Sequence, residues 1–201
     1  MKRHVELQEA ELYRESIPLS NTVKCLGITM HEKLSWQPHV DVVSSKCYAV
    51  TASLRRIRQV GIPTEGLLLV YKTLLIPVLS YCVSVWGGGY SNVESRTQVI
   101  QNDALRAITG RSRRESVSDV YSSYGLLTVR GLHRLSVAIL GFKMTNGRIP
   151  AEISFPLTPI SSRSSRRATS FCVPLVVKNS SRHALAYTLP KVWSSLPPEI
   201  R

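Results

Sequence analysis

The feature that most constrains the fold is a long, mostly apolar run from Leu67 to Trp86. A run of this length fits either a membrane-spanning helix or a helix buried in a protein core. Lys72 and Pro77 argue against the bilayer, because a lysine near the middle of a span costs roughly 2.5 to 3.5 kcal/mol on insertion scales and a proline disrupts a helix interior. We therefore expect a buried helix, kinked or broken at Pro77, with membrane association as the less favoured alternative.

A second helix is predicted just before this run, where apolar residues recur at gaps of three and four from Val40 to Ile57. This spacing places them along one face of a helix. Gly61 and Pro63 are expected to end it. Earlier in the chain, residues 4–30 alternate loosely between apolar and polar side chains, which indicates a few short strands.

Two further helices are predicted downstream. A glycine triplet at Gly87–Gly89 is expected to be a flexible break, after which Ser91 and Glu94 form a capping box that starts a helix through Ile108, closed by Gly110. Another helical pattern runs from Val129 to Asn146. Four apolar residues are expected on one face of that last helix: Leu132, Leu135, Ile139 and Phe142.

The last part of the chain has a different character. Ser161–Arg167 has no apolar period and is typical of a basic linker. Beyond it, Phe171–Val177 is predicted to form one strand. The whole pattern predicts a mainly α fold: a helical bundle with a few short N-terminal β-strands and a partly disordered basic C-terminal tail.

The charge balance indicates a polyanionic partner. The formal net charge is +13, from 26 Lys and Arg against 13 Asp and Glu, and such an excess favours nucleic acid or an anionic membrane surface. For the first predicted helix, a solvated polar face remains an equal alternative. The arginines that we expect to contact phosphates are Arg55, Arg56, Arg58, Arg106, Arg111, Arg113 and Arg114.

Nothing in the sequence indicates a catalytic centre. The phosphate-binding loop, the H-E-x-x-H metal motif and the G-x-S-x-G elbow are absent. The chain has only three aspartates, Asp41, Asp103 and Asp119, and no two are adjacent. We therefore expect binding without catalysis.

The cysteines do not indicate a disulfide framework or a common zinc module. The four are widely spaced and include no C-x-x-C pair. A ligand set of Cys25, His31, His39 and Cys47 is conceivable, but its spacing fits no common module and ordinary packing is favoured. The first residues lack the apolar run of a secretory signal, so we expect an intracellular protein.

Several segments carry a recognisable pattern. Lys24–Ile28 matches K-x-L-G-[IV], and Leu34–Val40 matches L-S-W-x-x-H-[IV]. Ile100–Gly110 matches I-Q-N-x-A-L-R-x-I-x-G, and Trp193–Arg201 matches W-N-x-L-P-x-x-I-R except that Ser194 replaces the asparagine. With these motifs, the chain resembles the C-terminal part of a non-LTR retrotransposon reverse transcriptase, from the end of its palm onward.

The resemblance implies a division of the chain. Residues 1–36 would be the end of the palm, 37–110 the helical thumb, 111–150 a helical C-terminal extension, and 151–201 a basic linker and C-terminal segment. Lys24 and Gly27 would lie beside the primer terminus. The alternative for this predicted strand is that Leu26 belongs to the core and that Gly27 only meets a strand or turn requirement.

The resemblance also implies partners. An RNA/DNA primer-template duplex would be gripped by the thumb, and the missing palm and fingers of the same polymerase would be further partners. The aromatic-x-Asp-Asp signature is absent, so the two Mg²⁺ ions of polymerisation would belong to the missing palm and this chain would bind no cofactor itself. An alternative is a truncated-element product, a small basic protein that binds RNA or another protein.

Overall fold

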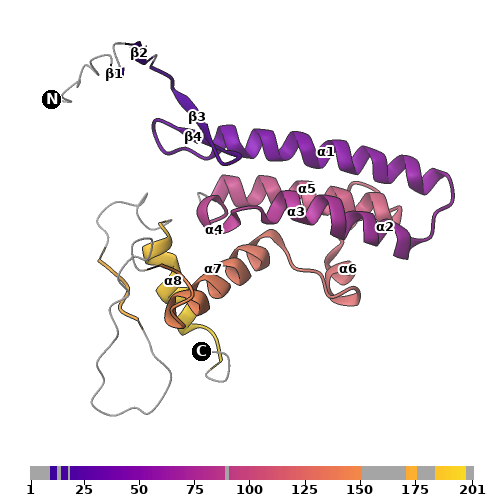
Figure 1. Ribbon diagram of the computed structural model, residues 1–201. Helices are drawn as coiled ribbons and strands as arrows, with labels where there is room; N and C mark the ends of the chain where they lie inside the picture. The colour runs from indigo at the N-terminus through magenta and orange to yellow at the C-terminus, as the bar shows by residue number, and fades with distance from the viewer. Residues whose placement is uncertain are drawn as a thin grey trace.

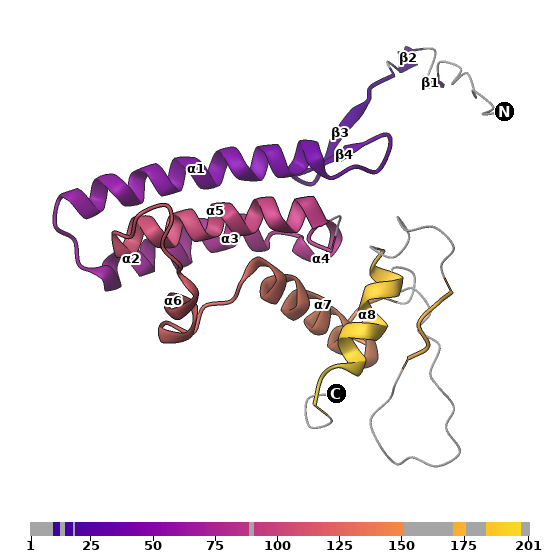
Figure 2. The same cartoon turned by 180° about the vertical axis from the view of Figure 1, so that it is seen from behind.

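A computed structural model describes residues 10–12, 15–17, 19–88, 91–150, 171–175 and 184–197. As predicted, these residues are mainly helical, with short strands at the N-terminal end (Figure 1). The helix α1 lies on one side of the layer formed by α2 to α5, and α7 with α8 lies on the other side (Figures 1 and 2). The fold is therefore a layered helical bundle with a β-hairpin at one end.

The predicted strands form two small antiparallel pairs. Strand β1 (Ala10–Leu12) pairs with β2 (Glu15–Ile17), and β3 (Thr22–Cys25) pairs with β4 (Ile28–His31). In the second pair Cys25 lies opposite Ile28, so the turn between them consists of two residues. This β3–β4 hairpin leads directly into α1.

The hairpin turn is made by Leu26 and Gly27, both with positive φ, 46° and 83°. Two successive residues in this region give the type I′ geometry that suits the twist of a hairpin, and glycine adopts it without steric cost. The prediction that Gly27 meets a turn requirement is confirmed. The alternative that Leu26 belongs to the core is wrong, because its side chain is 86% exposed.

Helix α1 (Gln37–Gln59) confirms the predicted apolar stripe. Val40, Cys47 and Leu54 are fully buried along it, and their face packs against α5 (Ser91–Thr109). Removal of the Cys47 thiol from water raises its pKa to about 12. This pair of long helices forms the frame of the molecule.

The apolar run from Leu67 to Trp86 forms four consecutive pieces rather than one helix. They are α2 (Thr64–Val70), a π-helical turn η1 (Tyr71–Leu75), α3 (Ile76–Ser80) and α4 (Val83–Trp86). Most of its large side chains enter the core, which confirms a buried segment. No helix in the described part of the chain is both long and apolar enough to cross a bilayer.

Of the predicted kink or break at Pro77, the break is absent, although a π turn that ends at Leu75 interrupts the regular α-helix just before it. The backbone remains helical through Pro77, which occupies the first turn of α3 directly after the π turn. At that position the missing N–H costs least, and the wider preceding turn accommodates the ring. The chain breaks instead at Tyr81 and Cys82, where Cys82 has a φ of 48°.

Helix α7 (Val129–Thr145) follows the short helix α6 (Ser118–Ser123) and confirms the predicted element, but its buried face differs from the prediction. Leu132 packs on the core as expected. By contrast, 48% of Leu135, 47% of Ile139 and 42% of Phe142 is exposed. The buried stripe consists of Val129, His133, Val137 and Gly141.

Close packing explains this stripe. A Cβ on Gly141 would lie 2.8 Å from Trp193 of helix α8 (Leu185–Ser194), so only glycine lets the indole lie there. His133 packs against Gly87 and Gly88, where a Cβ on Gly88 would lie 2.8 Å from its Nε2. The predicted break between helices is confirmed, since α4 ends at Trp86 and α5 begins at Ser91, and within it Gly87 and Gly88 make a tight contact with His133. Gly89 lies outside the described residues.

The predicted C-terminal tail contains a helix that the sequence analysis missed. Helix α8 packs on α7, and Val137, Leu189, Trp193 and Phe171 form a second hydrophobic cluster there. Phe171 forms an isolated bridge and residues 172–175 have no regular structure, which contradicts the predicted strand over that stretch. The linker Ser161–Arg167 and the last two residues of that strand, 176–177, lie outside the described residues.

Candidate nucleic-acid interface

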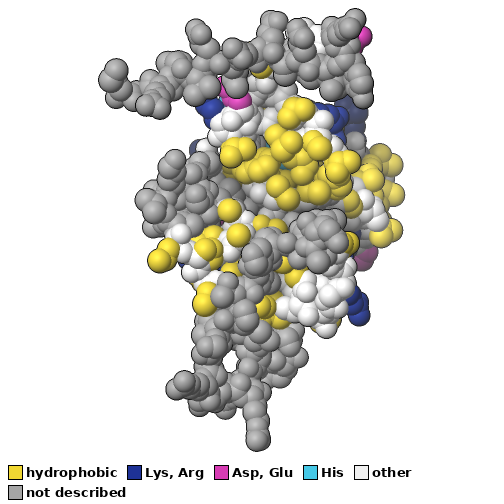
Figure 3. Space-filling model, turned by 60° about the vertical axis from the view of Figure 1, so that its left-hand side comes forward, with side chains coloured by type: hydrophobic (Ala, Val, Ile, Leu, Met, Phe, Trp, Pro, Cys, Tyr) yellow, Lys and Arg dark blue, Asp and Glu magenta, His cyan; other side chains and the backbone are white. Residues whose placement is uncertain are grey.

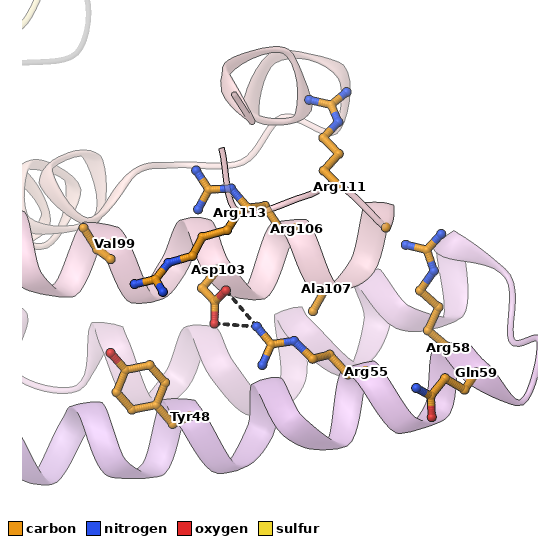
Figure 4. A pocket seen from close by; sticks show the side chains of 11 residues that line it. Tyr48, Arg55, Arg58, Gln59, Val99, Asp103, Arg106, Ala107, Arg111 and Arg113 are labelled. Carbon is orange, nitrogen blue, oxygen red and sulfur yellow. Dashed lines mark hydrogen bonds and ion pairs between the residues drawn. The ribbon is translucent and has the colours of Figure 1, made fainter. Parts of the chain in front are cut away.

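A groove of about 690 Å³ lies between the C-terminal halves of α1 and α5 and the loop that follows α5 (Figure 4). Its lining includes Asp103 as the acidic residue and Tyr48 as an aromatic residue. Five of the predicted phosphate-contacting arginines meet here, although they come from distant parts of the sequence: Arg55, Arg58, Arg106, Arg111 and Arg113. The lining is therefore strongly cationic.

Arg55 bridges the two long helices, α1 and α5. Arg55 Nη2 lies 2.7 Å from both carboxylate oxygens of Asp103. The guanidinium is half exposed, so the ion pair adds little to stability. Its geometric effect matters more, because it fixes a long side chain at the floor of the groove.

Arg58 closes the C-terminal end of α5. Its Nη1 donates to the carbonyl of Ile108 at 3.1 Å, and a cation at a helix C-terminus is favourable. The helix ends at Gly110, as predicted, with a φ of 71°. A Cβ there would lie 2.0 Å from Arg58 Nη2, so Gly110 also makes room for the guanidinium.

Arg106 and Arg111 organise the loop between α5 and α6. Arg106 Nε donates to the carbonyl of Glu115 at 3.0 Å. Arg111 donates to the carbonyl of Ser116 at 2.6 Å and to both carboxylate oxygens of Asp119. The hydrogen bond from Arg111 lowers the pKa of Asp119 to about 2. The loop is thus folded around its own arginines.

Arg56, Arg113 and Arg114 differ from the others. All three are exposed, and no hydrogen bond or ion pair within the described part of the chain engages their side chains. Arg113 lines the groove, whereas Arg56 and Arg114 lie outside its lining. Of the predicted arginines, these keep all their donors for an external anion.

Lys24 and Gly27 are not part of the groove. They lie on the β3–β4 hairpin, at the opposite end of α1 (Figure 1). The hydroxyl of Tyr81 donates to the carbonyl of Leu26 at 2.6 Å and so holds the turn on the bundle. The structure therefore separates the predicted site residues into two groups.

Exposed apolar side chains surround the hairpin. Figure 3 shows them gathered on the end of the molecule where the hairpin and α4 lie. Besides Leu26 they include Val42, Tyr81 and Val85, which are each 41 to 50% exposed. A pocket of about 370 Å³ beneath Gly27 is also lined mostly by apolar groups.

The I-Q-N stretch, Ile100–Asn102, has a structural role that sequence reasoning missed. Gln101 is fully buried, and its Nε2 donates to Tyr71 Oη and to the carbonyl of Leu127, each at 2.8 Å. Tyr121 Oη donates to Asn102 Oδ1 at 2.7 Å. Burial raises the pKa of Tyr71 to about 12. This network ties α5 to η1, to α6 and to the chain before α7.

The proposed zinc set does not assemble. Cys47 is buried in the core, Cys25 is exposed, and the His39 Nδ1 accepts from the backbone N–H of Thr29 at 3.3 Å. Among the described residues, no three His, Cys, Asp or Glu side chains are placed to hold a metal ion.

Comparison with known proteins supports the resemblance noted in the sequence. The chain is similar to the RNA-directed DNA polymerases of non-LTR retrotransposons. The particular relatives come from two insects, Drosophila melanogaster and Bradysia coprophila.

The similarity covers less than half of the chain in each case. The chain is 33% identical to the probable RNA-directed DNA polymerase from transposon BS of Drosophila melanogaster over 88 residues. These residues are 43% of this chain and 10% of the relative. The chain is 30% identical to the probable RNA-directed DNA polymerase from transposon X-element of Drosophila melanogaster over 104 residues. These residues are 49% of this chain and 11% of that relative.

A third relative is the retrovirus-related Pol polyprotein from the type-1 retrotransposable element R1 of Bradysia coprophila, 30% identical over 91 residues, which are 43% of this chain and 9% of the relative. The matched region thus spans about a tenth of the length of each relative. No protein-family model matches the chain, and no solved structure matches it.

Proposed function

We propose that this chain is a polymerase-derived fragment that grips an RNA/DNA primer-template duplex as the thumb of a retrotransposon reverse transcriptase. The observation that carries the proposal is the groove in which five arginines from α1, α5 and the following loop surround one aspartate. Contact with phosphates needs cations on a rigid frame and no base-specific groups. The names of the three relatives supply the polymerase context.

The internal bonds of these arginines support binding rather than oppose it. A guanidinium has five N–H donors, and Arg58 and Arg106 each use one of them within the described structure. The remaining donors are held in place before a ligand arrives, so less side-chain entropy is lost on binding. Arg113 and Arg114 add exposed positive charge beside them.

The hairpin is proposed to lie beside the primer terminus. Leu26 is exposed at its tip in a backbone conformation that is costly for leucine, and such local strain is common at functional sites. Gly27 has no side chain to obstruct a backbone, and Lys24 adds a positive charge. The exposed apolar surface around the hairpin is the proposed packing site for the missing palm and fingers.

Polymerisation is assigned to the missing palm. A two-metal reaction needs clustered carboxylates, and the described residues offer no such group for Mg²⁺. We therefore derive no metal-dependent step for this chain and expect no template-directed nucleotide addition by the pure protein. Primer extension by the purified 201-residue chain would contradict this part of the proposal.

The main test is binding of the full chain to a fluorescent RNA/DNA primer-template over a salt series. For the wild type we expect the logarithm of affinity to fall linearly with the logarithm of salt concentration. The R113Q/R114Q variant should lower that slope by about 0.9 per lost phosphate contact. Its matched control is K143Q/R148Q, which removes the same charge near the end of α7.

The outcomes are distinct. A larger effect of R113Q/R114Q than of K143Q/R148Q supports a localised grip at the groove. Equal effects would mean that only net charge matters, which favours the alternative of a small basic RNA-binding remnant. Absence of duplex binding by a folded wild-type sample would overturn the proposed function.

A further inference from the structure

Another pocket, of about 350 Å³, lies at the other end of α5 from the groove. It is bounded by Gly87 and Gly88 before α5, by the first half of α7 and by α8. None of its residues belongs to the arginine set predicted from the sequence. Its charged and polar lining includes Glu94, Arg130, His133, Arg134 and Lys191.

His133 gives this pocket an unusual group. The residue is only 8% exposed, and its Nε2 is buried without a hydrogen-bond partner in the described structure. Burial lowers its pKa, so the ring is neutral near pH 7. A buried polar nitrogen without a partner is unfavourable, because it has lost its hydrogen bonds to water and gained none in return. Because Nε2 packs against Gly88, an acceptor atom from the pocket would reach it after a shift of that contact.

The surrounding charges select the kind of acceptor. Arg130 and Arg134 lie one turn apart on α7, and Lys191 faces them from α8. Glu94 opposes them, at 4.0 Å from Arg130 Nε. The lining therefore carries three cations against one carboxylate, which favours an anion.

Two of the cations are already positioned. Arg134 Nη2 donates to Ser195 Oγ at 3.0 Å, and Lys191 Nζ donates to Tyr187 Oη at 2.7 Å. Both heads retain further N–H donors, because lysine has three and arginine five. Arg134 donates from α7 and Lys191 from α8, so the two helices together can hold one oxyanion between them.

We propose that the pocket between α5, α7 and α8 is a phosphate-binding site, with Arg130, Arg134, Lys191 and the His133 Nε2 as its donors. The phosphate belongs either to a nucleic-acid backbone or to a free phosphorylated ligand. The backbone assignment rests on the proposed function, whereas the phosphate chemistry does not. If the duplex is the source, α5 would contact it near both of its ends.

The first test uses inorganic phosphate alone. Side-chain NMR of His133 in the full chain should show a saturable shift of the ring signals as phosphate is added. In R130Q/K191Q the Kd should rise by about tenfold or more, as expected for loss of a charged hydrogen bond. K143Q/R148Q, with the same loss of charge, should behave like the wild type.

Absence of a saturable shift in the wild type would overturn the site, as would equal weakening in R130Q/K191Q and K143Q/R148Q. All four substitutions are at exposed positions, so each variant is expected to fold. Far-ultraviolet circular dichroism checks that it does. H133N lacks the ring observed in the first test, so its phosphate affinity is measured by isothermal titration calorimetry. That affinity should fall while the far-ultraviolet helical signal is retained.

The second test identifies the source of the phosphate. If it is a duplex backbone, R130Q/K191Q should lower the salt slope of primer-template binding, and the duplex should shift the His133 signals. If phosphate shifts these signals but the duplex does not, the site takes a free phosphorylated ligand. Failure of the wild type to bind duplex would contradict only the proposed function, because the phosphate titration remains decisive for the site.

Discussion

Leu26 occupies a backbone conformation that suits asparagine or glycine better than leucine. Its φ is 46°, and its side chain is 86% exposed, so burial of the side chain does not offset the backbone strain. We expect L26N to raise the free energy of unfolding by about 0.5 to 1 kcal/mol, because Asn-Gly is the preferred type I′ pair. Urea denaturation monitored by circular dichroism measures this change.

Leu34 provides a matched position. It also has a positive φ, 53°, and is 74% exposed, so L34N should stabilise the fold by a similar amount. If the hairpin tip contacts the primer-template, L26N should weaken duplex binding and L34N should not. Equal duplex affinity in both variants would mean that the strained leucine at the tip does not contribute to binding.

The Arg111–Asp119 pair predicts a pH effect with a definite sign. Arg111 lowers the pKa of Asp119 from its model-compound value of 3.8 to about 2 in the folded protein. The pair therefore contributes stability above pH 3.8, and this contribution is lost as the pH falls towards 2. An NMR titration of the Asp119 carboxyl carbon should have a midpoint near 2. In R111Q the midpoint should return towards 3.8, and a midpoint unchanged from the wild type would contradict the pairing.

At the scale of the elements, the buried amide of Gln101 couples three segments of chain: α5, η1 and the residues before α7. Q101L would leave the carbonyl of Leu127 and the hydroxyl of Tyr71 without their partner. We expect a loss of about 2 to 4 kcal/mol in unfolding free energy, because each buried unsatisfied group costs about 1 to 3 kcal/mol. Q59L, at an exposed glutamine on α1, should change stability by less than about 0.5 kcal/mol.

A double-mutant cycle isolates the network. Y71F alone removes the hydroxyl that accepts from Gln101. If the two side chains interact directly, the cost of Q101L/Y71F should fall short of the sum of the single costs by about 1 kcal/mol. Additive costs would show that the two residues stabilise the fold independently.

The spacing of apolar residues was sufficient to predict the long helices from the sequence. The apolar stripe of α1 and the glycine that ends α5 are local signals, and both were predicted correctly. The buried face of α7 was not, because His133 and Gly141 are buried for reasons that lie in distant segments, at Gly88 and Trp193. A scale of hydrophobicity ranks neither residue as a core residue.

The candidate site was predictable only in part. Charge alone singled out the arginines, and five of them do meet in one groove. Their internal partners were not predictable, since Asp103 is 48 residues from Arg55 and backbone carbonyls leave no mark in a sequence. The cationic pocket around His133 was missed for the same reason, because α7 and α8 meet only in the folded chain.

The whole molecule has two hydrophobic clusters of unequal size. The larger one joins the hairpin, α1 to α6 and the start of α7, and the smaller one joins the rest of α7 to α8 through Trp193 and Leu189. W193A should weaken the smaller cluster by about 3 to 5 kcal/mol, as for other large-to-small core substitutions. Hydrogen exchange should accelerate in α8 while the amides of α1 and α5 remain protected.

Equal acceleration in α1 and α5 would instead mean that the two clusters unfold as one cooperative unit. Tyr48→Ala is the matched control for loss of an aromatic side chain, because Tyr48 is half exposed on α1. It should leave the exchange rates of α8 unchanged.

The π turn at Tyr71–Leu75 makes the length of this segment as important as its composition. Each residue of an α-helix advances the chain by about 100° around the axis. Deletion of one residue from the turn would restore a regular helix, but α2 would then be rotated relative to α3 by roughly that angle. Leu67 and Leu68 would leave the core, and Tyr71 would turn away from Gln101. The segment therefore tolerates a change of side chain better than a change of length.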